Sequence, residues 1–165
     1  MKIRDAVESD LSAIVAIYNA TVPYQIVTAD LEPVSVESRV HWFRQHTPER
    51  YPLWVIELEE ETAAWLGFQP FYGRPAYRHT AELSIYVSPN HRRRGIGKLL
   101  LARAIAHSST LQIKTLLGFI FAENQPSLRL FEQFGFEQWG YLPQVAEFGQ
   151  VQRDLVILGR RLAAP

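Results

Sequence analysis

The stretch from Thr80 to Ser108 constrains the fold of this chain more than any other part of its sequence. Over Thr80–Ser88 the pattern has the two-residue period of a β-strand, with Glu82, Ser84 and Tyr86 on one face and apolar residues on the other. A basic loop with two glycines follows, and then a helical pattern with these residues turned inward: Ile96, Leu99, Leu100 and Ala104. Because an internal strand of an α/β sheet is usually apolar on both faces, the polar face is expected to line a cleft.

Shorter patterns predict the remaining elements of a single three-layer α/β domain, residues 1–165. Three more helices are predicted: one that Ser9 caps, with Leu11, Ile14, Val15, Tyr18 and Val22 on its apolar face; one that Ser35 caps and that ends near Pro48; and one that Pro126 opens and Gly135 ends. Further strands are predicted over Ile3–Ala6, Leu53–Leu58, Ala63–Phe71, Lys114–Phe121, Phe136–Leu142 and Gln152–Leu158, with a turn at Glu59–Thr62.

Composition and charge exclude several classes of function. Seventeen Lys and Arg balance seventeen Asp and Glu, so a nucleic-acid binder is disfavoured. The chain has no cysteine, which excludes disulfides, thiolate zinc sites and cysteine nucleophiles, and its five histidines lack metal-ligand spacing. Because neither a long apolar run nor an apolar leader is visible, we expect a cytoplasmic protein that binds no membrane.

The loop Arg92-Arg93-Arg94-Gly95-Ile96-Gly97-Lys98 is predicted to bind an anion. A helix N-terminus offers unpaired N–H groups and the positive end of a dipole, and glycines let a ligand approach the backbone, which suits a pyrophosphate. The spacing fits neither a P-loop nor the dinucleotide fingerprint, whose third glycine would stand at Leu100. A solvated basic turn is the alternative, but three adjacent arginines repel one another and favour a multiply charged ligand.

This loop resembles the acyl-CoA pyrophosphate loop of the GNAT superfamily of N-acetyltransferases, whose pattern is Gln or Arg, two spacers, Gly, one spacer, and Gly or Ala. Most of the chain is similar to the phosphinothricin N-acetyltransferase-like branch. The segments that carry this resemblance are Ile3–Ala6, Ile17–Asn19, Ser35–Val36, Trp42–Phe43, Arg74–Thr80, Ser84–Val87, Asn124, Ser127 and Phe134–Phe136. The resemblance implies a mixed, mostly antiparallel sheet of about seven strands flanked by helices. It also implies acetyl-CoA as acyl donor and a homodimer, for which apolar residues late in the chain could supply a patch.

The resemblance further implies which residues hold the cofactor. Backbone groups of Ile85, Tyr86 and Val87 would pair with the pantetheine arm. The pyrophosphate would lie on the basic loop, which comprises Arg92, Arg93, Arg94, Gly95, Ile96, Gly97 and Lys98. Asn124 would bind near the pantetheine, with Ser127 close by. Asn124 is also suited to cap the helix that follows it, and both roles can coexist.

Glu82 is the predicted general base. An α-amine with a pKa near 8 is about 10% neutral at pH 7, so positioning supplies much of the rate and a base adds to it. The enzymes that the chain resembles carry a glutamate here, whereas residue type alone favours an ion pair with an arginine such as Arg78. A backbone N–H of residues 85–87 can meet the oxyanion.

Phe131 stands where many GNAT enzymes carry a tyrosine, and this branch often a histidine, for protonating the leaving thiolate. Phenylalanine donates no proton and is expected in the core. The thiolate is then protonated by water or leaves as the anion, which a thiol pKa of about 8.5 permits. Tyr86 and Tyr141 are weaker alternatives.

Substrate contacts are predicted for Tyr72, Arg74 and Arg78, the arginines being either carboxylate clamps or plain surface residues. Two departures from the branch, Leu83 and Phe148–Gln152, bear on the acceptor more than on the cofactor. The sequence therefore predicts an acetyl-CoA-dependent N-acetyltransferase that acts directly on the amine of a small amino-acid-like substrate, without a metal. A protein or peptide N-acetyltransferase and a non-catalytic acyl-CoA-binding domain are the alternatives.

Overall fold

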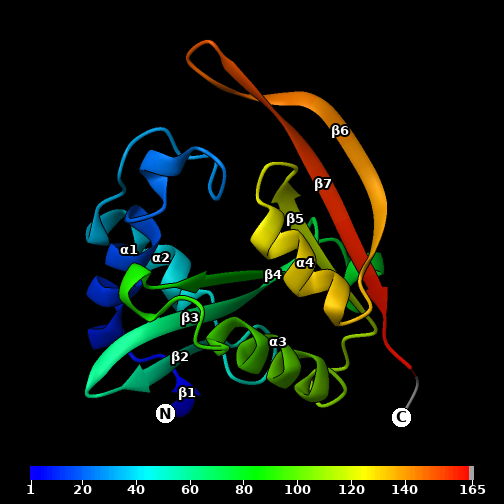
Figure 1. Cartoon of the computed structure of the whole chain (residues 1–165). Coiled ribbons are helices and arrows are strands. Elements are labelled where there is room, and N and C mark those ends of the chain that lie inside the picture. Colours follow the sequence, from blue (N-terminus) through cyan, green and yellow to red (C-terminus); the bar gives the residue numbers. More distant parts are fainter. Residues whose placement is uncertain (164–165) are drawn as a thin grey trace.

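The computed structural model describes residues 1–163 as a seven-stranded sheet with helices on both faces (Figure 1). The strands are β1 (Lys2–Asp5), β2 (Leu53–Leu58), β3 (Glu61–Pro70), β4 (Thr80–Val87), β5 (Thr115–Phe121), β6 (Glu137–Phe148) and β7 (Val151–Arg161). The helices are α1 (Leu11–Asn19), α2 (Val36–Arg44), α3 (Ile96–His107) and α4 (Gln125–Gln133), with short 3₁₀ helices η1 (Glu8–Asp10), η2 (Val22–Tyr24), η3 (Pro75–Tyr77) and η4 (Pro89–His91). None of the helices described is long and apolar enough to cross a membrane.

The strand order is β1-β2-β3-β4-β5-β7-β6, and every neighbouring pair is antiparallel except β4 and β5. The predicted mixed, mostly antiparallel sheet is therefore confirmed. α3 and α4 cover one face over the larger hydrophobic cluster, which includes Ile56, Leu66, Leu83, Leu100 and Phe131. α1 and α2 cover the other face, where a smaller cluster comprises Ile14, Ile17, Leu53, Val55 and Trp65.

The start of α1 differs from the sequence prediction. Ser9 lies within η1 and does not cap the helix. Instead, the Asp10 carboxylate accepts the Val7 N–H at 2.8 Å and a guanidinium N–H of Arg4 at 2.6 Å. The ion pair with Arg4 also holds the pKa of Asp10 below its usual value. The bond to Val7 closes the start of η1, whose N-cap is Val7, and α1 follows η1 directly at Leu11.

The other helix boundaries confirm some of the sequence patterns and correct others. α2 begins as predicted, because Ser35 Oγ accepts the Ser38 N–H at 3.1 Å, although it ends at Arg44, well before Pro48. In α3, Leu99 is 43% exposed, so its predicted inward orientation is wrong, and Leu101 is fully buried in its place. At about 100° per residue, both lie about 60° outside the stripe formed by residues 96, 100 and 104, on opposite sides, so helical periodicity alone does not distinguish them.

The last two strands are longer than the sequence patterns predict. They form a hairpin that arches away from the rest of the sheet, with Gly149 at φ +63° in its turn (Figure 1). The register of β6 shifts between Leu142 and Ala146, where Pro143 has no N–H to contribute to the ladder. This irregularity interrupts the alternation of side chains between the two faces of β6, so the sequence of its second half lacks the two-residue period of a strand.

β4 and β5 are paired over only a short part of their lengths. Residues 80–82 pair with residues 115–117, and the described part of β5 pairs with no later residue of β4. On its other edge, β4 pairs with β3 as far as Val87. The two strands therefore separate after Glu82, and the edge of β4 from Leu83 to Val87 has backbone groups available to a ligand.

Candidate functional site

The basic loop between β4 and α3 has a backbone suited to an anion. Arg93 has φ +60° and Gly95 has φ +77°, and α3 begins directly afterwards. A side chain built at Gly95 would meet no atom within 4 Å, so the space there is open. The first N–H groups of α3 have no acceptor within the helix, and left-handed residues in such loops gather N–H groups around anions.

The side chains of this loop make separate contacts. The Arg92 guanidinium lies 5.4 Å from the centre of the Tyr24 ring, and an Arg94 nitrogen lies 3.9 Å from a Glu59 carboxylate oxygen. Gly97 faces α4, since a Cβ there would come within 3.1 Å of a methyl group of Leu130. The lack of a side chain at Gly97 thus allows α3 and α4 to pack closely, and Gly97 contributes only backbone groups to the loop.

Asn124 caps α4, which confirms that interpretation of the residue. Its side-chain oxygen accepts the Ser127 N–H at 3.4 Å, and the residue is only 8% exposed. Asn124 follows β5 directly, at the end where β5 has separated from β4. The cap therefore fixes a polar side chain beside the open part of the sheet.

Glu82 is a half-buried carboxylate at the point where β4 and β5 separate. The expected alternative, an ion pair with Arg78, is not observed among residues 1–163, and Arg78 Nε instead donates to His79 Nε2 at 3.0 Å. Burial raises the pKa of Glu82 above its usual value. A carboxylate with a raised pKa is a stronger base, and this one lies on the face of β4 that also carries Ser84 and Tyr86.

A pocket of about 150 Å³ lies on this face of β4, under α1 and α2, and we call it the aromatic pocket. Its lining comes from β3 and β4 (Trp65, Gln69, Ser84, Tyr86), from α1 (Ile14, Val15, Tyr18), from α2 (Arg39, Trp42) and from Val34. The Trp65 and Tyr86 rings stack with centroids 4.5 Å apart. Burial raises the pKa of Tyr86, so its hydroxyl remains protonated at neutral pH.

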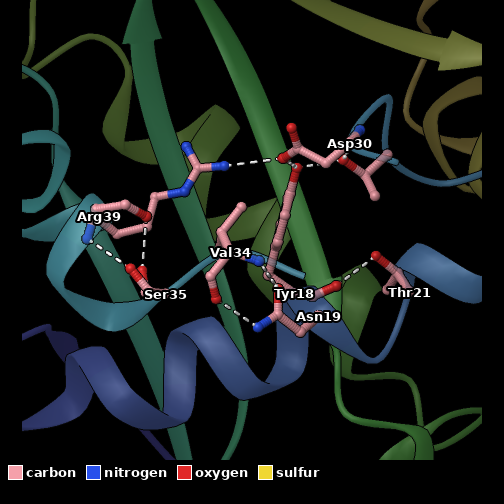
Figure 2. A network of polar contacts seen from close by, with 9 residues as sticks. Tyr18, Asn19, Thr21, Asp30, Val34, Ser35 and Arg39 are labelled. Carbon is pink, nitrogen blue, oxygen red and sulfur yellow. Dashed lines mark hydrogen bonds and ion pairs between the residues drawn. The ribbon is translucent and has the colours of Figure 1, made fainter. Parts of the chain in front are cut away.

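A polar network fixes one wall of the aromatic pocket (Figure 2). The Tyr18 hydroxyl bonds to Thr28 and Asp30, and burial raises the pKa of Tyr18. Arg39 donates to Asp30 at 3.0 Å and lies over the Tyr18 ring. Because Asp30 neutralises Arg39, the pocket suits an uncharged group.

A second pocket, of about 460 Å³, lies near the start of β2 and the end of β3, and we call it the arginine pocket. Three arginines line it, together with aromatic residues: Arg50, Arg74, Arg78, Tyr51, Phe71 and Tyr77. No ion pair joins these arginines to an acid within residues 1–163. The pocket is therefore suited to an anion.

The structure brings two of the three predicted substrate residues together and leaves the third apart. Arg74 and Arg78 line the arginine pocket, but Tyr72 is 78% exposed and packs on Phe71 without lining it. Gln69, which lines the aromatic pocket, is the register partner of Glu82 on β4. Glu82 therefore lies beside the aromatic pocket.

Phe131 is a core residue, as expected. It is 4% exposed, and its ring packs edge-on against Phe136. The ring also lies over Gly118 of β5, where a Cβ would come within 2.8 Å of it.

Tyr141, one of the weaker alternatives for a proton donor, bonds through its hydroxyl to Asp154 within the β6–β7 hairpin, and this bond raises its pKa. In the part of the chain that the structure describes, no three His, Asp or Glu side chains are grouped so as to hold a metal ion.

An anion loop, an open strand edge beside it and a desolvated carboxylate beside a pocket are the parts that a group-transfer enzyme with a phosphorylated carrier needs. Comparison with known proteins gives the family: the chain belongs to the acetyltransferase (GNAT) family, whose model matches residues 14–136.

Individual relatives match almost the full length. YwnH of Bacillus subtilis (strain 168) is 49% identical over 99% of this chain and all of its own. The L-amino acid N-acyltransferase MnaT of Escherichia coli (strain K12) is 33% identical over 91% of this chain and 88% of its own. The crystal structure of a GNAT superfamily phosphinothricin acetyltransferase from Sinorhizobium meliloti in complex with acetyl-CoA has a TM-score of 0.92 at 29% identity, covering 98% of this chain and 88% of that one.

The pocket residues that sequence reasoning missed include Arg39, Trp42, Arg50, Trp65 and Gln69. A signal existed in β3, where Trp65 and Gln69 share one face through the two-residue period. α2 and the segment before β2 offered no such signal, because only the packing of distant segments brings them to the site.

Proposed function

We propose that this chain is an acetyl-CoA-dependent N-acetyltransferase that acetylates the amine of a small, amino-acid-like molecule. Membership of the GNAT family and similarity to enzymes named for L-amino acids and phosphinothricin support this proposal. The observation that carries it is the position of Glu82, a desolvated carboxylate beside the aromatic pocket, at the point where β4 leaves β5.

The open edge of β4 and the basic loop fit acetyl-CoA, which when bound supplies an activated acetyl thioester. In this proposal the backbone of Ile85, Tyr86 and Val87 bonds the pantetheine arm, residues 92–98 hold the pyrophosphate, and Asn124 and Ser127 lie beside the arm. The free strand edge and the open space at Gly95 support it. A backbone N–H of residues 85–87 is the proposed donor to the developing oxyanion.

In this proposal each pocket binds a different part of the acceptor. The unpaired arginines of the arginine pocket are suited to bidentate binding of a carboxylate. The aromatic pocket has the volume that holds a benzene-sized group in other proteins and carries little net charge, so it suits an uncharged side chain. Glu82, beside the aromatic pocket, takes the proton from the amine, directly or through water. Phe131 contributes packing and no proton.

A turnover screen tests this function. Purified protein and acetyl-CoA are mixed with α-amino acids, their sulfoximine and sulfone analogues, polyamines and peptides, and the free thiol is measured. We expect turnover with amino acids that carry uncharged, medium-sized side chains, and little with polyamines or peptides. Faster reaction of peptides would favour a peptide acetyltransferase. Binding of acetyl-CoA without thiol release from any amine would overturn the proposal in favour of a non-catalytic domain.

The proposal includes a homodimer formed through the β6–β7 hairpin. β6 is an edge strand of the sheet, and it exposes these apolar side chains: Trp139, Tyr141, Leu142 and Val145. An apolar edge strand favours association, and a second copy can cover it symmetrically. Sedimentation at micromolar concentration should give twice the 19.0 kDa chain mass, and a monomer there contradicts the proposal. We place the enzyme in the cytoplasm, where acetyl-CoA is supplied.

A further inference from the structure

The sheet consists of two lobes that are joined by a short stretch of strand pairing. β1 to β4, with α1 and α2 packed on them, form the first lobe, and β5, β7 and β6 form the second. Only residues 80–82 and 115–117 pair across the junction. The hydrogen bond from the Lys114 N–H to the His79 carbonyl, at 2.8 Å, lies at the same closed end. Beyond it the lobes diverge, and the open end is where the acceptor and the acyl donor have to meet.

The loop between α1 and α2, residues 20–35, belongs to the first lobe and is firmly held at its far end. Asn19 bonds both the carbonyl and the N–H of Val34, at 2.8 and 2.9 Å, and Tyr18 bonds to Thr28 and Asp30 (Figure 2). Those contacts build the wall of the aromatic pocket. The position of this wall therefore depends on the position of the loop.

Within the loop, the exposed residues 23–25 have weaker ties to their own lobe than the residues on either side. The N–H groups of Tyr24 and Gln25 bond only to carbonyls of residues 21 and 22, and Gln25 has a left-handed backbone at φ +53°. The exposed Tyr24 ring lies under Arg92 of the basic loop. This part of the loop therefore needs a further contact to hold it across the opening.

Arg153 of β7 supplies that contact. Its Nε donates to the Gln25 carbonyl at 3.0 Å, and another of its nitrogens lies 3.8 Å from a carboxylate oxygen of Glu123, just after β5. Its side chain is only 21% exposed. Among the hydrogen bonds and ion pairs within residues 1–163, the Arg153–Gln25 bond is the one that joins the two lobes at the open end.

We propose that Arg153 is a positioning residue for the acceptor. It holds the α1–α2 loop across the gap between the lobes and so keeps Tyr18 and Arg39 in place as the wall of the aromatic pocket. This role rests on the proposed acetyltransferase function. Because Arg153 acts through the loop, its loss should weaken acceptor binding and leave the cofactor loop intact.

Kinetics of Arg153→Ala test the role, with Arg161→Ala as the matched control. Arg161 is an exposed arginine on the same strand, so its removal changes the net charge equally. For Arg153→Ala we expect the acceptor KM to rise about tenfold, the size of a lost charge-assisted hydrogen bond, while kcat and the acetyl-CoA KM stay within about twofold. Arg153→Lys, which retains one donor, should lie between Ala and wild type, and Arg161→Ala should match wild type.

Hydrogen exchange gives a readout that does not depend on turnover. Residues 21–30 should exchange faster in Arg153→Ala than in wild type or Arg161→Ala, with the sheet unchanged. An unchanged acceptor KM, an equal rise in both KM values, or unchanged exchange in the loop would overturn the role of Arg153. Lack of turnover in the wild type contradicts the proposed function itself, whereas normal wild-type turnover with unaltered Arg153→Ala kinetics contradicts only this inference.

Discussion

Replacing Glu82 by glutamine tests the chemistry most directly. The substitution keeps the size of the side chain and removes its basicity. We expect kcat near neutral pH to fall by about 10²–10⁴-fold, which corresponds to about 2.7–5.4 kcal/mol of transition-state stabilisation. Acetyl-CoA affinity should hardly change, because the proposed cofactor contacts on β4 come from its backbone.

The pH dependence separates proton transfer from substrate binding. Burial raises the pKa of Glu82, so wild-type activity should decline, as the pH falls, at a higher pH than an exposed glutamate would give. Above the amine pKa of about 8 the acceptor deprotonates itself, so the deficit of Glu82→Gln should shrink. Full activity of the variant at pH 7 would refute the base role. A deficit that is equally large at about pH 10 would assign Glu82 to substrate binding.

The burial of Glu82, which makes its carboxylate a stronger base, is also expected to lower the stability of the folded protein at neutral pH. A carboxyl group whose pKa is higher in the folded than in the unfolded state stabilises the fold below its unfolded pKa, and that contribution is lost as the pH rises through the folded value. At neutral pH the ionised Glu82 is a half-buried charge without an ion-pair partner among the described residues. Glu82→Gln should therefore melt at a higher temperature than wild type at pH 7, and at a similar temperature near pH 4. A lower melting temperature at pH 7 would contradict this account.

Three further substitutions test the fold and the proposed cofactor role of the basic loop, residues 92–98. Arg93→Glu reverses a charge beside the open space of the loop and should weaken acetyl-CoA binding at least tenfold by calorimetry; unchanged affinity would contradict the proposed pyrophosphate position. Gly118→Ala places a Cβ within 2.8 Å of the Phe131 ring and should destabilise the protein by about 1–3 kcal/mol in urea unfolding, whereas a neutral result would mean that the ring moves freely. Ser35→Ala removes the acceptor for the Ser38 N–H and should cost about 1 kcal/mol, with Ser35→Asp, which can still cap, as its control.

Local sequence patterns were sufficient to predict the structure where a segment determines its own conformation. The alternation in β4, the cap at Ser35 and the glycine that ends α4, Gly135, all follow from a few neighbouring residues, and the structure has them as predicted. The family resemblance supplied the strand number and the mixed sheet. The length of β6 was missed because Pro143 interrupts the ladder and its alternating pattern.

The pockets could not be predicted in full, because they are assembled from distant segments. Arg50 precedes β2 and reaches a pocket whose other arginines lie in the β3–β4 loop. Arg39 and Trp42 become pocket residues only when α2 packs over β3 and β4. For Glu82, the sequence left open an ion pair with Arg78, and only the three-dimensional structure shows that the two side chains are not paired.

The short pairing of β4 with β5 also makes the proposed acyl donor part of the folding equilibrium. A pantetheine arm that bonds the free edge of β4 acts as an additional strand, bound by the native state and not by the unfolded chain. By mass action it adds about 2.7 kcal/mol to the free energy of unfolding when its concentration is 100 times Kd. The lifetime of this protein in the cell would then follow the supply of acetyl-CoA, and a starved cell would degrade the enzyme faster than a well-fed one.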